Sequence, residues 1–144
     1  NTKVRPIVVG QVLRRITAAA LVIQHKADIV EKLGPQQLGC GRPDGLEGVR
    51  VSVAEALLMP EWSAYALDVR NAFNSISRQR VLDRIREDLP ALLPYVAYCY
   101  AGDVPLTASS TSQQPGAPLY VHVNSRNGTM QGDPLSNVCF AIAL

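Results

Sequence analysis

The stretch SAYALDVRNAFNSI, residues 63–76, is an apolar run interrupted by one carboxylate. Its first part, Ser63 to Val69, is short and contains β-branched and aromatic residues, which is typical of a buried strand. A carboxylate inside an apolar strand is costly unless it is ionised and paired, and a divalent cation is one such partner. Asp68 therefore predicts either a bound cation at this strand or a cap for the following turn, and its immediate neighbours favour neither.

Two helices are expected before this strand. Apolar residues spaced by three and four predict the first helix over residues 10–33, where Gly34 and Pro35 end it. Its buried stripe is expected to contain Leu13, Ile16, Ala20, Ile23, Ala27 and Val30. The second helix follows the Gly-rich turn of residues 39–45 and ends at Pro60, and its expected inward face contains Leu46, Val49, Val53 and Leu57.

Three more helices and a hairpin are expected after the strand. An amphipathic helix ends at Pro90, a further helix covers residues 91–100, and residues 104–108 and 119–123 form a hairpin. The amphipathic helix has an inward face of Val81, Leu82, Ile85 and Leu89, and a face interpreted as solvated that carries Arg78, Arg80, Arg84 and Arg86. A last helix begins with Leu135, Val138 and Ile142. This order of elements predicts an α+β fold.

The composition excludes several classes of protein. The chain has 144 residues, of which 47% are apolar, and this suits one compact unit or part of one. Its three cysteines form no CxxC pair, so neither a disulfide framework nor a zinc site is expected. The uncharged stretch of residues 89–102 contains two prolines and is too short to cross a bilayer, so no membrane partner is expected.

Charge is unevenly distributed along the chain. Residues 1–50 contain eight Lys and Arg against four Asp and Glu, a balance of +4, whereas residues 51–144 contain six against eight, a balance of −2. The division suits a protein that grips phosphate with one part and holds a cation with the other, although surface scatter is the simpler explanation. The missing initiator Met and the end inside an apolar run lead us to expect an excerpt of a longer polypeptide.

A second motif, GTMQGDPLS, occupies residues 128–136. Its two glycines give flexible backbone on either side of Gln131, whose amide can contact a flat ring or a phosphate, and a helix begins immediately behind. Asp133 followed by Pro134 suits the cap and the first position of that helix. We therefore interpret Asp133 as a capping residue rather than a metal ligand.

Together these segments resemble the reverse transcriptase family, most closely its non-LTR, LINE-type retrotransposon branch. The Asp68 segment is similar to the family's strand carboxylate followed by Ala-Phe, and residues 128–136 are similar to its Gly-x-x-Gln-Gly-x-Pro-Leu-Ser block. Upstream, VRPI at residues 4–7 resembles the fingers segment, and QLGCGRPDGLE at residues 37–47 resembles the Gly-rich turn of that branch. The blocks occur in the family's order, which makes the resemblance specific and extends it over nearly the whole chain.

The resemblance implies the fingers and palm of a right-hand polymerase, with a small antiparallel palm sheet packed on helices. Residues 1–62 are then part of the fingers and the fingers–palm connection, and residues 63–144 are part of the palm. The implied activity is RNA-directed DNA polymerisation, which adds dNTP to the 3′-hydroxyl of a DNA primer or target along an RNA template. Two Mg²⁺ ions, with Mn²⁺ as the alternative, are the implied cofactors. A nuclear location with a cytoplasmic ribonucleoprotein stage is implied as well.

The resemblance also implies roles for individual residues. Asp68 matches the first metal carboxylate, a catalytic residue, and the carbonyl of Val69 could supply a further oxygen to the ions. Phe73 matches the aromatic steric gate that leaves no room for a 2′-hydroxyl. The other matches are triphosphate contacts at Arg5 and Lys3, nucleotide contacts at Gln131 and Gly132, and template contacts at Gly41, Arg42 and Gly45. The competing interpretations are a solvated terminus for Lys3 and a plain surface charge for Arg42.

One family motif is missing, namely the Tyr/Phe-x-Asp-Asp hairpin that carries the remaining metal carboxylates, which is not found in residues 1–144. The fragment alone is therefore expected to be inactive, with that motif and the thumb downstream in the same polyprotein. Asn74 and Asp133 also stand where many relatives have Asp and Ser. Two hypotheses stay open: a working polymerase in the full-length parent, and a catalytically inactive retroelement remnant or domesticated nucleic-acid-binding domain. Group II intron and retron polymerases share these blocks, and the Gly-rich turn favours the retrotransposon branch.

Overall fold

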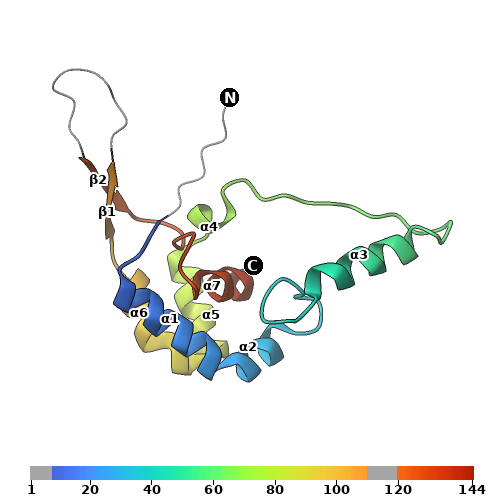
Figure 1. Cartoon of the computed structure of the whole chain (residues 1–144), viewed down its shortest axis with the longest axis horizontal. Coiled ribbons are helices and arrows are strands. Elements are labelled where there is room, and N and C mark those ends of the chain that lie inside the picture. The colour runs from blue at the N-terminus through green and yellow to red at the C-terminus, as the bar shows by residue number, and fades with distance from the viewer. Residues whose placement is uncertain (1–7, 110–119) are drawn as a thin grey trace, which may run out of the picture.

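The computed structural model describes residues 8–109 and 120–144, which form helices and a two-stranded antiparallel sheet (Figure 1). This combination agrees with the predicted α+β class. In chain order the elements are α1 (Val12–Gln24), α2 (Lys26–Leu33), α3 (Gly45–Ala56), α4 (Ala72–Ser75), α5 (Arg78–Asp88), the 3-10 helix η1 (Pro90–Leu92), α6 (Leu93–Tyr100), β1 (Val104–Ser109), β2 (Tyr120–Ser125) and α7 (Ser136–Ala143).

Helix α5 lies in the middle of the helical body and packs against α6 and α7. The Ser77 hydroxyl caps its first turn by accepting a hydrogen bond from a backbone N–H. The predicted inward face is confirmed, since Val81 and Ile85 are fully buried and Leu89 is nearly so, while Leu82 is half-buried. The spacing of the apolar residues identified this face because they all lie on a single side of the helix.

The predicted last helix and hairpin are also present. Leu135, Val138 and Ile142 are all buried, although α7 begins at Ser136, later than Asp133 and Pro134 suggested. Strand β1 pairs with β2 in an antiparallel register, and the pair extends away from the helical body (Figure 1). Leu119, which was expected to open the second strand, lies outside the described residues.

The helix predicted over residues 10–33 is divided at His25 into α1 and α2. The predicted buried stripe is wrong, because Leu13, Ile16 and Ile23 are 79%, 60% and 75% exposed. The buried side of α1 instead contains Ala18, with Leu21 and Val22 half-buried against the core. Helix α1 has apolar residues on most of its circumference, so the spacing was compatible with two different buried stripes. The stripe that is buried contains the small Ala18, which allows the helix to pack closely on the core.

Helix α3 has the predicted position in the sequence but not the predicted packing. Its expected inward residues are exposed, from 41% at Val49 and Val53 to 80% at Leu46, and the helix extends away from the rest of the body (Figure 1). Only its first residue is buried. An apolar stripe needs an opposing surface before it becomes an inward face, and the extended residues 62–69 carry the chain away from such a surface.

The predicted buried strand at residues 63–69 is wrong as well. This segment has no regular secondary structure, and Tyr65 and Leu67 are 90% and 95% exposed. A strand requires a hydrogen-bonded neighbour, and β1 and β2 pair with each other. Within residues 8–109 and 120–144 no strand lies beside this segment, so its composition alone does not make it a strand.

Candidate functional site

The two sequence motifs meet at the short helix α4. The Thr129 N–H donates a 2.7 Å hydrogen bond to the Phe73 carbonyl, and the Gly128 N–H donates a 3.0 Å hydrogen bond to the Ile76 carbonyl. A helix of one turn leaves most of its carbonyls without an intrahelical partner, so the turn at residues 128–136 satisfies groups that α4 exposes. The segment after Asp68 and the Gly-x-x-Gln-Gly turn are thus joined backbone to backbone.

This junction requires glycine at position 128. Gly128 has a φ of 71°, and a Cβ built on it would lie 2.4 Å from the Asn74 Cα and 2.4 Å from the Phe73 oxygen. A side chain at this position would push the two motifs apart. The motif predicted a flexible backbone at Gly128, and in the structure this glycine also lies in close contact with α4.

Phe73 and Gln131 lie on either side of this junction. The Phe73 ring is half-buried and packs on Phe140 of α7, with 4.9 Å between ring centroids. Gln131 is half-buried and its carbonyl accepts a 3.0 Å hydrogen bond from the Val8 N–H. Gly132 is exposed, with a φ of 110°. The candidate gate and the candidate nucleotide contacts are therefore held by neighbouring elements and stay accessible.

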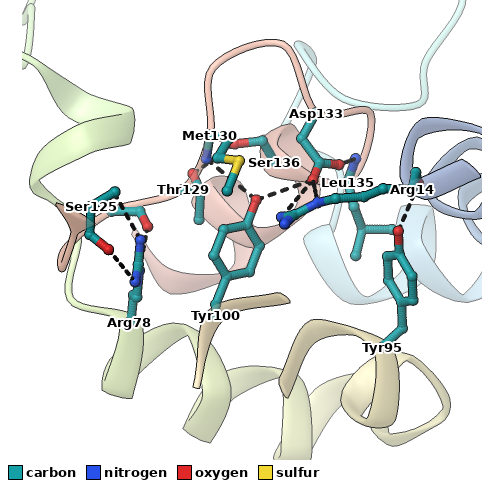
Figure 2. Close-up of polar contacts among 11 residues, drawn as sticks. Arg14, Arg78, Tyr95, Tyr100, Ser125, Thr129, Met130, Asp133, Leu135 and Ser136 are labelled. Carbon is teal, nitrogen blue, oxygen red and sulfur yellow. Dashed lines mark hydrogen bonds and ion pairs between the residues drawn. The ribbon is translucent and has the colours of Figure 1, made fainter. Parts of the chain in front are cut away.

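Arg78 is the main support of the junction, and it was not predicted. The side chain is buried and donates from Nε to the Gly128 carbonyl at 2.8 Å, and Figure 2 shows it pointing toward Ser125. Its Nη1 donates to the carbonyls of Gly102 at 2.7 Å and Ser125 at 2.9 Å, and its Nη2 donates to the Ser125 hydroxyl at 2.9 Å. One guanidinium thus ties the base of the hairpin to the start of the Gly-rich turn.

The interpretation of Arg78 as a solvated residue is therefore wrong, although it holds for the other arginines of α5. Arg80, Arg84 and Arg86 are exposed, and the last two form ion pairs with acidic residues three or four positions away on α5. The signal was in the spacing, since residue 78 precedes Val81 by three and Ile85 by seven. Arg78 therefore lies on the buried stripe, where a charged side chain needs several partners.

Asp133 anchors the other end of the turn. Its side chain is 5% exposed, and its Oδ2 accepts hydrogen bonds from Arg14 Nε at 3.2 Å and Arg14 Nη2 at 3.1 Å (Figure 2). The Tyr100 hydroxyl donates to the same oxygen at 3.3 Å, and the Leu135 N–H donates to Oδ1 at 2.9 Å. The last bond closes a local turn before α7, whose cap residue is Leu135 without a side-chain cap bond, so the prediction that Asp133 caps this helix is wrong. The buried ion pair with Arg14 was not predicted.

Tyr100 connects the two arginines. Its ring lies 5.3 Å from the Arg14 guanidinium carbon and 5.6 Å from that of Arg78, a cation–π arrangement. Its hydroxyl also accepts a hydrogen bond from the Met130 N–H at 3.3 Å. Burial, together with the nearby Asp133 carboxylate, raises the pKa of Tyr100 well above its ordinary value. Tyr100 therefore stays a neutral hydrogen-bond donor at physiological pH.

The candidate metal residues are far less enclosed. Asp68 and Val69 are exposed in the extended segment before α4. Among the residues that the structure describes, no three His, Cys, Asp or Glu side chains gather in a way that could hold a metal ion. One exposed carboxylate does not fit a two-ion centre, so residues 8–109 and 120–144 by themselves do not form one.

The remaining candidates lie away from the junction or outside the description. Lys3 and Arg5 fall outside the described residues. In the Gly-rich turn, Gly41 has a φ of 74°, and Arg42 Nη2 donates a 3.2 Å hydrogen bond to the carbonyl of Gly34, the residue that ends α2. Gly45 is buried, and a Cβ there would overlap the backbone of the preceding turn. Arg42 and Gly45 thus have structural contacts within this turn, and their role as template contacts stays a prediction.

Comparison of the chain with protein-family models, with curated proteins and with solved structures finds no match in any of the three. Among the described helices, none combines the length and the apolar character that a bilayer crossing requires.

Proposed function

We propose that the chain is the fingers and palm portion of an RNA-directed DNA polymerase of a non-LTR retroelement. Residues 1–62 belong to the fingers and their connection to the palm, and residues 63–144 belong to the palm. The polypeptide that contains them extends a DNA primer along an RNA template with dNTP as substrate. The ordered sequence blocks support this proposal, and one structural observation carries it.

That observation is the direct contact between two of the blocks. The hydrogen bond from the Thr129 N–H to the Phe73 carbonyl brings the aromatic ring of one block beside the turn that carries Gln131. A polymerase must check the sugar and the base pair of one nucleotide together, so its gate and its base-pair contacts need to be neighbours.

Phe73 is suited to a gating role because one neighbouring ring restrains it while part of its surface stays exposed. Its contact with Phe140 restricts the ring, and its partial exposure leaves another side open to a ligand. A steric gate discriminates through rigidity, because a mobile ring would yield to a 2′-hydroxyl. The proposal therefore assigns the preference for deoxynucleotides to Phe73.

The proposed two-ion centre requires carboxylates in addition to those of the described residues. Asp68 is exposed, and its carboxylate is a suitable cation ligand, but a two-Mg²⁺ centre needs further carboxylates. The proposal assigns these to a Tyr/Phe-x-Asp-Asp segment encoded after residue 144. When bound, the ions would polarise the phosphate and the attacking hydroxyl.

The first test is the coding DNA beyond codon 144. An in-frame Tyr/Phe-x-Asp-Asp within the next few tens of codons supports a polymerase. A stop codon, a frameshift or a substituted Asp pair contradicts the proposal and favours an inactive remnant or a nucleic-acid-binding domain.

The second test is primer extension by the polypeptide that includes the downstream segment. Asp68→Ala should abolish extension while RNA-template affinity stays within about twofold, because the change removes an ion ligand and no nucleic-acid contact. Glu61→Ala alters another exposed carboxylate a few residues earlier and should keep full activity. Retained extension by Asp68→Ala refutes the catalytic role of that residue.

A further inference from the structure

Arg14, Tyr100 and Asp133 form a polar network behind the turn at residues 128–136 (Figure 2). The Asp133 side chain is 5% exposed and Tyr100 is 2% exposed, so neither can touch a nucleotide bound at the accessible side of the turn. The proposed chemistry uses none of the three side chains. Burying a charged network costs free energy unless every polar group in it has a hydrogen-bond partner. The partners of these three side chains therefore indicate which part of the chain the network stabilises.

The network holds the turn on both sides of Gln131 and Gly132. Before them, the Met130 N–H donates to the Tyr100 hydroxyl at 3.3 Å. After them, the Leu135 N–H donates to Asp133 Oδ1 at 2.9 Å. Gln131 and Gly132, the proposed nucleotide contacts, thus lie between two backbone positions, Met130 and Leu135, that are each held by a buried side chain.

Arg14 extends the network to the N-terminal segment. It pairs with Asp133, and its carbonyl accepts a 2.7 Å hydrogen bond from the Tyr95 hydroxyl of α6. Six residues earlier, the Val8 N–H donates to the Gln131 carbonyl. Residues 8–14 and the turn are therefore tied together at two places, at Val8 and at Arg14.

We propose that Arg14, Tyr100 and Asp133 are positioning residues that preorganise Gln131 and Gly132 for an incoming nucleoside triphosphate. This inference rests on the proposed function. A turn that is already ordered spares the ligand the entropic cost of ordering it. Loosening the network therefore weakens nucleotide binding without removing any group that contacts the nucleotide.

A merely structural role has a different kinetic signature. Unfolded enzyme does not turn over, so destabilisation lowers the apparent kcat and leaves the KM for dNTP unchanged. Lost preorganisation raises the KM of the molecules that stay folded, because it weakens ground-state and transition-state binding alike. The ratio of the two effects separates the roles.

The first experiment needs no activity and uses the 144-residue chain. Tyr100→Phe removes one hydroxyl, and Tyr98→Phe is the matched control because Tyr98 lies on the same helix and is 84% exposed. Loss of the bond to Met130 should speed hydrogen exchange of the amides of residues 130–133, 135 and 136 about 5-fold, the effect of one ordinary hydrogen bond, with exchange in α5 unchanged. Equal exchange in the two variants overturns the inference.

The second experiment measures primer extension by the polypeptide that includes the downstream segment. Arg14→Ala should raise the KM for dNTP about 10-fold with kcat within about twofold, Arg14→Lys should recover part of the loss, and Arg15→Ala, at an exposed neighbour, should change neither. An unchanged KM in Arg14→Ala overturns the inference even if kcat falls. A wild-type polypeptide that incorporates no dNTP refutes the proposed function instead, and the exchange experiment still decides whether the network orders the turn.

Discussion

Replacing Arg78 with alanine should destabilise the chain far more than the same replacement of any other arginine of α5. The guanidinium donates to the Gly128, Gly102 and Ser125 carbonyls and to the Ser125 hydroxyl. The Gly128 bond is buried, whereas water can replace the donor at the partly exposed Gly102 and Ser125 carbonyls. Arg78→Ala therefore leaves one fully buried acceptor and two partly buried acceptors without their donor.

The expected size of the loss follows from these contacts. An acceptor left unsatisfied in a buried position costs about 1–3 kcal/mol, and hydrogen bonds from charged donors lie at the upper end. Allowing for water at two of the three carbonyls, we expect a loss of about 3–4 kcal/mol in the free energy of unfolding. This is a large part of the roughly 5–15 kcal/mol available to a domain of this kind.

Urea unfolding followed by circular dichroism at 222 nm measures the effect, because helices dominate the signal. Arg86→Ala is the matched control, since the Arg86 side chain is 60% exposed and forms an ion pair with Asp83, also largely exposed, and it should lose less than about 1 kcal/mol. If Arg78→Ala does not fold, Arg78→Lys keeps the charge but places its donors on a single nitrogen, and should show an intermediate loss. Equal losses for Arg78→Ala and Arg86→Ala would refute the assignment of Arg78 as the support of the junction.

Three further predictions address the junction, the gate and pH. Gly128→Ala should cost about 3 kcal/mol, because its Cβ overlaps the α4 backbone and its φ is positive, whereas Gly48→Ala, with open space around it on α3, should gain up to about 1 kcal/mol in the same urea assay. In primer extension, Phe73→Val should admit ribonucleotides while dNTP incorporation continues, and an unchanged preference for dNTP would contradict the gate assignment. Burial, assisted by the neighbouring Cys99, raises the pKa of Tyr95 to about 12, above the value of about 10 in an unfolded chain. Stability from the neutral Tyr95 is therefore present below about pH 10 and is lost as the pH rises toward 12, so urea midpoints should fall less steeply over that range in Tyr95→Phe than in the wild type.

Local signals predicted those parts of the fold that depend on neighbours in the sequence. Helix α5 was predicted to end at Pro90, and its three-and-four spacing has one apolar side, so its C-terminal end and its buried face follow from the residues, whereas its Ser77 cap was found only in the structure. The hairpin and α7 follow for similar reasons. Residues 63–69 show the limit, because strand composition has no effect without a partner strand.

The candidate site divides in the same way. Its motifs, including Phe73 and Gln131, stand out in the sequence because their residue types and spacing suit a chemistry. Their supports do not, since Arg14 and Asp133 are separated by 119 positions and neither belongs to a pattern that predicts the other. Arg78 is the exception, because its place on the apolar stripe of α5 could have identified it as buried.

By itself, the sequence determined the buried face of α5, the positions of the hairpin strand β1 and of α7 along the chain, and which segments carry chemistry. Only the tertiary structure decided that α1 turns Ala18 rather than Ile16 toward the core, that α3 stays exposed, and that Gly128 closes on Phe73. The physical reason is that caps, turns and propensities act between residues a few positions apart. Burial and ion pairing depend on which surface comes to lie opposite, and that surface belongs to a distant part of the chain.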